Sequence, residues 1–137
     1  MNKLTRTDLR EKIMTILYQI NVYDINKINY EVDSVIKEVM EIDNEFVKDI
    51  VYGVIYKKDE LDRLANENLK DWTIDRLGNT DQAILRMGIY ELLYTDTPDV
   101  VVINEAVELA KLYSDDNVKS MINAVLDSIY HKKVDHE

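Results

Sequence analysis

The chain has 137 residues, no cysteine and a formal net charge of −10. This length fits one domain, and the lack of cysteine excludes a disulfide scaffold, thiolate zinc sites and a cysteine nucleophile. No apolar run approaches the roughly 20 residues that span a bilayer, and the polar N-terminus is unlike a signal peptide, so we expect a cytoplasmic protein without membrane contact.

The charge is unevenly distributed along the chain. Residues 1–22 hold four basic and two acidic side chains, whereas residues 24–49 hold three lysines and eight acidic side chains. Because RNA phosphates are bound by lysine and arginine, the basic end is the region that suits RNA. The acidic body suits a basic protein partner. Solvated helix faces that keep the protein soluble explain the same composition equally well.

The first half of the chain shows the apolar periodicity of amphipathic helices. In the first predicted helix, apolar residues recur at three- and four-residue steps from Leu9 to Ile20. A second helix is predicted at residues 30–40. Asn44 is a favourable N-cap residue for a third, long helix, which we expect to continue to about Leu69.

The second half opens with a short helical turn that ends near residue 77. Asn79 and Gln82 have the spacing of a capping box for the next helix, predicted at residues 80–94. Pro98 cannot lie inside that helix and separates it from another that ends near residue 113.

A last helix is predicted from about residues 114–116 to Ile129, and no stretch of the chain alternates as a strand would. The sequence therefore predicts an all-α fold of about seven helices. We expect a single domain over residues 1–137, with two packed subdomains at about residues 1–70 and 71–137.

Catalytic and metal-binding patterns are weak. His131 and His136 are the only histidines, and both lie in a charged tail with a spacing that fits one helix face poorly. The chain has no glycine-rich phosphate loop and no serine with a histidine partner in a structured region. We predict no enzymatic activity, no metal and no cofactor.

Several polar residues lie among apolar helix positions, and we expect them to connect helices through buried or half-buried hydrogen bonds. Arg86 is expected to pair with Glu91 or Glu105. The full set is Arg86, Glu91, Asn104, Glu105 and Asn123.

The cations of the first helix are the best candidates for a binding surface. Arg6 and Arg10 are one helical turn apart and so share one side, and Lys3 precedes them. Single-stranded RNA is commonly held by such cations together with aromatic groups. Arginines at this spacing are also commonly solvated or paired with acids, such as Asp8 and Glu11.

Two parts of the chain resemble the NusB family of bacterial transcription antitermination factors. The string TRTDLREKIMTILYQ (Thr5–Gln19) is in register with the arginine-rich start of that family, with Arg6 and Arg10 at family arginine positions. Three further strings resemble its C-terminal half: ILRMGIYELL (Ile84–Leu93), INEAVELAK (Ile103–Lys111) and MINAVL (Met121–Leu126).

The resemblance implies RNA-binding transcription antitermination. Such a protein would bind the boxA segment of nascent ribosomal RNA together with ribosomal protein NusE, within the RNA polymerase antitermination complex. We expect RNA contacts from the first helix and from the start of the last one, at Lys3, Arg6, Arg10, Tyr18, Asn117, Lys119 and Met121. We expect NusE contacts near the start of the helix at residues 80–94, at Asp81, Gln82 and Ile84.

Two other functions stay open. The first is a NusB-like module for protein contact that has little RNA affinity of its own. The second is an enzyme-associated domain, since rRNA cytosine methyltransferases carry a NusB-like N-terminal domain, although no methyltransferase segment follows in this sequence. The sequence leaves the oligomeric state open. One alternative is a homodimer, which would bury the arginine face.

Overall fold

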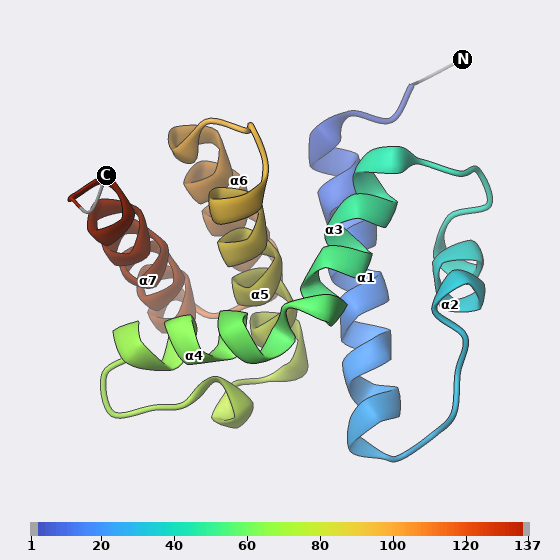
Figure 1. Ribbon diagram of the computed structural model, residues 1–137, viewed down its shortest axis with the longest axis horizontal. Coiled ribbons are helices and arrows are strands. Elements are labelled where there is room, and N and C mark those ends of the chain that lie inside the picture. The colour runs from blue at the N-terminus through green and yellow to red at the C-terminus, as the bar shows by residue number, and fades with distance from the viewer. Residues whose placement is uncertain (1–2, 136–137) are drawn as a thin grey trace.

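The computed structural model describes residues 3–135, which contain seven α-helices, one short 3-10 helix and no β-strand. The predicted all-α fold class is therefore confirmed (Figure 1). The helices are α1 (Arg6–Ile25), α2 (Val32–Val39), α3 (Glu45–Tyr56), α4 (Lys58–Asn68), η1 (Ile74–Arg76), α5 (Asn79–Tyr94), α6 (Asp99–Tyr113) and α7 (Asp116–Asp135). Within residues 3–135, every helix is too short or too polar to cross a membrane.

The helices lie in two groups that meet along α1 and α5. In Figure 1, α1, α2 and α3 lie on one side of the molecule, and α5, α6 and α7 lie on the other. The helix α2 packs against α1, and α1 packs against both α3 and α5. The helix α3 also packs against α5, and the helix α4 packs against α5 and α7.

The predicted third helix, residues 44–69, is wrong as a single element. The chain bends at Lys57, whose φ of −107° and ψ of 14° depart from helical values, and two helices result. Both segments pack on α5, but their other packing partners differ. Val54 of α3 and Leu61 of α4 are both buried, but α3 packs on α1 whereas α4 packs on α7. One straight helix could not reach both partners.

The central helix of the fold is α5. Its side chains are buried without interruption from Gln82 to Leu92, because α1, α3, α4, α6 and α7 surround it. Close packing on α5 requires glycine at Gly53 of α3, where an added Cβ would lie 2.1 Å from a ring atom of Tyr90. The burial of α5 on all sides explains why its sequence is apolar nearly all round the helix.

The start of α5 differs from the predicted capping box. Gly78 occupies the N-cap position, and no side chain caps the helix. The side-chain oxygen of Asn79 instead accepts a hydrogen bond from the amide of Asn21 at 2.7 Å. The amide of Gln82 donates to the main-chain oxygen of Leu77 at 2.8 Å. Both side chains therefore connect α5 to other segments.

Buried polar residues do connect the helices, but with partners other than those predicted. Arg86 of α5 donates to both carboxylate oxygens of Asp62 in α4, at 2.7 and 3.1 Å, and not to Glu91 or Glu105. Asn104 and Asn123 are exposed, so their predicted buried bonds are wrong.

Candidate nucleic-acid interface

The first helix begins at a capping box that fixes how its cations project. The hydroxyl of Thr5 accepts from the backbone N–H of Asp8 at 3.1 Å, and the Asp8 carboxylate accepts from the Thr5 N–H at 2.9 Å. The bond from the Thr5 N–H to the carboxylate, with a further contribution from the Thr5 hydroxyl, lowers the pKa of Asp8 below its ordinary value. The helix is thereby well formed from its first residue, Arg6.

Arg6 is an exposed cation held on an aromatic ring. Its guanidinium carbon lies 4.0 Å from the centre of the Phe46 ring in α3. Such a contact stabilises by roughly 0.5–1 kcal/mol at an exposed site. It also orients the planar guanidinium, which keeps its charge on the surface.

Arg10 is placed differently from the surface cation that the sequence predicted. Its side chain is buried, and the residue is only 3% exposed. Its Nε donates to Oε1 of Glu91 at 2.9 Å, and its Nη2 donates to the other oxygen of the same carboxylate. Its Nη1 lies 3.7 Å from the Glu105 carboxylate. Arg10 thus connects α1 to α5 and α6 inside the protein.

An open groove of about 790 Å³ lies beside these arginines. Its walls come from α1, from the start of α3 and from the connection between α5 and α6. Four carboxylates line it, so the potential around Arg6 is less positive than the arginine alone would produce. The lining carboxylates are Glu45, Asp49, Asp96 and Glu105.

Lys3 lies in a second hollow, on another side of α1. Lys12 and Tyr113 line the same hollow. The hydroxyl of Tyr113, at the end of α6, donates to the carboxylate of Glu11, and this hydrogen bond raises the pKa of Tyr113. The carboxylates of Asp8 and Glu11 also line this hollow, so Tyr113, which is 49% exposed, lies beside two cations and two carboxylates.

Sequence reasoning missed Lys12 and Tyr113. Tyr113 is the last residue of α6 and precedes the start of α7 by three positions. An exposed aromatic residue in a helix–helix connection was a usable signal. Its proximity to α1 was not, because Glu11 and Tyr113 are 102 residues apart.

The start of α7 presents the second predicted group of RNA contacts. The carboxylate of Asp115 accepts from the backbone N–H of Val118 at 2.9 Å and so caps the helix. Asn117 is exposed, Lys119 is half-buried, and Met121 is half-buried. Asn117 and Met121 line one cleft, which Trp72 also lines.

The predicted partner residues at the start of α5 are mostly inaccessible. Gln82 is 4% exposed and Ile84 is fully buried, so their side chains cannot form a contact surface, and that prediction is wrong for both. Asp81 is half-buried, lines the cleft near Met121 and accepts a hydrogen bond from the Ser114 hydroxyl. Asp81 is the residue of this group that reaches the surface.

The predicted RNA contacts thus fall into separate places. Arg6 faces the acidic groove, Lys3 lies in the hollow with Tyr113, and Met121 lies in the cleft at the start of α7. Tyr18 is 40% exposed on α1 and lines none of these hollows.

No cluster of potential ligands for a metal ion occurs within residues 3–135. His131 lies 3.3 Å from the Asp127 carboxylate, one turn away on the exposed face of α7. His136 lies outside the described residues.

Comparison with solved structures finds the same fold in three NusB proteins or complexes. NusB of T. maritima superposes with a TM-score of 0.80 at 27% identity, over 95% of this chain and 93% of that one. A complex of the antitermination factors NusB and NusE with dsRNA superposes with a TM-score of 0.77 at 29% identity, over 93% and 96%. NusB of Aquifex aeolicus in solution reaches 0.72 at 28% identity, over 96% and 91%.

Sequence comparison agrees over nearly the whole chain. The transcription antitermination protein NusB of Macrococcus caseolyticus is 41% identical over 132 residues, 95% of this chain and 99% of that protein. The Staphylococcus aureus protein of the same name is 43% identical over 127 residues, 92% and 98%. The family model described as NusB matches residues 7–131. The chain therefore belongs to the NusB family of transcription antitermination proteins.

Proposed function

We propose that this chain binds boxA-type single-stranded RNA together with NusE and acts in the RNA polymerase antitermination complex. The observation that carries the proposal is the hydrogen bond from the Tyr113 hydroxyl to the Glu11 carboxylate, which holds the end of α6 against α1. It sets two cations and an exposed aromatic ring around one hollow, three residues from the start of α7. The NusB–NusE–RNA complex of the same fold supports the assignment.

In this proposal the phosphates are held by exposed cations and the bases by aromatic and amide groups. Lys3 and Lys12 would neutralise phosphates on one side of α1, and Arg6 would do so on another side. The Tyr113 ring offers a stacking surface, which would contribute roughly 1–3 kcal/mol per base. Arg10 acts indirectly, because its buried ion pair holds α1 against α5.

The start of α7 extends this surface. The Asn117 amide both donates and accepts hydrogen bonds, so it suits a base edge, and Lys119 adds a further cation. Met121 offers a flexible apolar contact rather than an aromatic stack. Tyr18, exposed on α1, remains a proposed contact at the edge of the surface.

NusE is proposed to bind beside the start of α5. Asp81 lines the cleft there together with Trp72 and Arg76, and Trp72 is 52% exposed. A half-exposed tryptophan next to charged residues is typical of the anchor of a protein interface. The buried Gln82 and Ile84 support this surface from beneath.

The test is a fluorescence-anisotropy titration of boxA RNA and of a scrambled strand, each with and without NusE. We expect the boxA strand to bind more tightly, with a larger preference when NusE is present. Tyr113→Ala should weaken boxA binding about tenfold or more, because a stacking surface is lost. Tyr113→Phe keeps the ring but loses the hydroxyl bond to Glu11, so we expect its affinity to lie between those of the wild type and Tyr113→Ala. Equal binding of both strands in both conditions would contradict the proposal.

A protein-contact module with little RNA affinity is the alternative, and the carboxylates around Arg6 favour it. That alternative predicts NusE binding without any preference for boxA.

We further propose a cytoplasmic protein without catalytic activity. A homodimer that covers the Arg6 face would lower RNA affinity as protein concentration rises, and sedimentation over a concentration series would detect it.

A further inference from the structure

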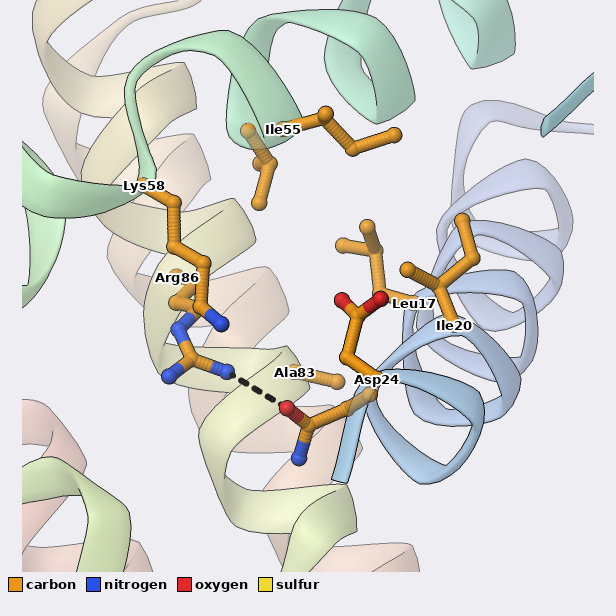
Figure 2. A pocket seen from close by; sticks show the side chains of 9 residues that line it. Leu17, Ile20, Asp24, Ile55, Lys58, Ala83 and Arg86 are labelled. Carbon is orange, nitrogen blue, oxygen red and sulfur yellow. Dashed lines mark hydrogen bonds between the residues drawn. The ribbon is translucent and has the colours of Figure 1, made fainter. Parts of the chain in front are cut away.

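A small pocket lies between the two helix groups, away from the proposed RNA surface. It is formed where the second half of α1, the bend between α3 and α4, and the first half of α5 meet (Figure 2). Its volume is about 150 Å³. Cavities of about this size in other proteins hold a benzene-sized molecule.

Most of the pocket wall is apolar. The side chains that form this part come from all three elements, and their methyl groups give no hydrogen bonds to water. They are Leu17, Ile20, Val54, Ile55 and Ala83. Such a lining favours an apolar body over a cluster of water molecules.

Two cations point into the pocket from the side of α4 and α5. Figure 2 shows the side chains of Lys58 and Arg86 directed into the space, facing Leu17, Ile20 and Asp24 of α1. The ammonium group of Lys58 has no hydrogen bond or ion pair to any described residue. The polar part of the lining is these two cations together with Asn21 and Asp24 of α1. Because the Arg86 charge is paired with Asp62, the unpaired Lys58 ammonium is the group that attracts an anion, and the Asp24 carboxylate across the pocket opposes it.

The guanidinium of Arg86 is held in place but has hydrogen-bonding capacity left. Its Nε and Nη2 are bound by Asp62, and the residue is 6% exposed. Its Nη1 makes one long hydrogen bond, 3.4 Å, to the side-chain oxygen of Asn21. The Nη1 group carries two hydrogens, so it can donate to a ligand without losing the Asp62 pair.

We propose that this pocket binds a small monocarboxylate with an apolar body of about the size of benzene. Its carboxylate lies between Lys58 and Arg86, and its body packs on Leu17, Ile20 and Ile55. The carboxylate of Asp24 on the opposite wall repels a second negative charge, so inorganic phosphate and dicarboxylates should bind more weakly. The proposal does not rest on RNA binding.

The test uses benzoate as the probe, with the full chain followed by amide NMR shifts. We expect saturable binding with a Kd on the order of 1 mM, as suits so few ligand atoms. The shifts should cluster at residues 17–24, 54–58 and 83–86. Benzyl alcohol, which has the same ring without the charge, should bind at least about tenfold more weakly.

Lys58→Met tests the cation and keeps most of the side-chain volume. It should weaken benzoate binding about tenfold and leave benzyl alcohol binding unchanged. Lys37→Met, at an exposed position of α2, is the matched control and should leave both unchanged. The absence of saturation, shifts that cluster elsewhere, equal binding of the alcohol, or full benzoate binding by Lys58→Met would each overturn the proposal.

Discussion

Replacing Arg10 should strongly lower the free energy of unfolding, although the sequence pattern suggested a surface cation at this position. Arg10→Met removes the partner of Glu91, which is 2% exposed and would be left as an uncompensated buried carboxylate. Breaking such a buried pair costs about 3–5 kcal/mol. Small domains have a total free energy of unfolding of roughly 5–15 kcal/mol, so this loss is a large share.

Urea unfolding followed by circular dichroism measures the effect. Arg6→Ala is the matched control on the same helix and should cost about 1 kcal/mol or less, because its contact with Phe46 is exposed. The double variant Arg10→Met with Glu91→Leu should recover much of the loss, since an apolar pair of similar volume avoids the buried charge. A loss for Arg10→Met no larger than that for Arg6→Ala would refute this reasoning.

Two further predictions concern stability. Gly53→Ala should lower the free energy of unfolding by roughly 1–3 kcal/mol, because the new Cβ would overlap the buried Tyr90 ring. Gly78→Ser is the control and should cost little. Urea unfolding midpoints measure both variants, and equal midpoints would contradict the close packing of Gly53 on Tyr90. Hydrogen bonding and burial raise the pKa of Tyr52 and Tyr94 to about 12. Because these pKa values are raised from an ordinary value near 10, their contribution is complete below about pH 10 and is lost as pH rises to about 12. Replacing both by phenylalanine should flatten that decline in thermal melts, and an unchanged decline would count against it.

Local patterns predicted most of the helices because each depends on neighbouring residues. The apolar spacing of the first helix is compatible with one buried stripe, and Pro98 ends one helix before the next begins. The bend at Lys57 was not predictable in this way. It accompanies a change in packing partner, from α1 for α3 to α7 for α4, and no local residue type marks it.

The candidate site was predicted less well because its contacts join distant segments. Arg10 and Glu91 are 81 residues apart, so the sequence could not distinguish a buried pair from a surface cation. Ile84 was predicted as a partner contact from the resemblance, but this apolar residue is completely buried in the packing of α5. The resemblance to a family indicated candidate regions, but not which side chains in them reach the surface.

The most direct test of RNA binding with NusE is the salt dependence of boxA affinity, measured with NusE at saturation. The wild-type affinity should fall steeply as salt rises, because phosphate contacts release counterions. Arg6→Ala should bind more weakly at low salt and lower the slope of log Kd against log salt by about 1. An Arg6→Ala slope and affinity equal to wild type would contradict the placement of RNA along α1. Salt-independent binding without preference for boxA would contradict RNA recognition itself.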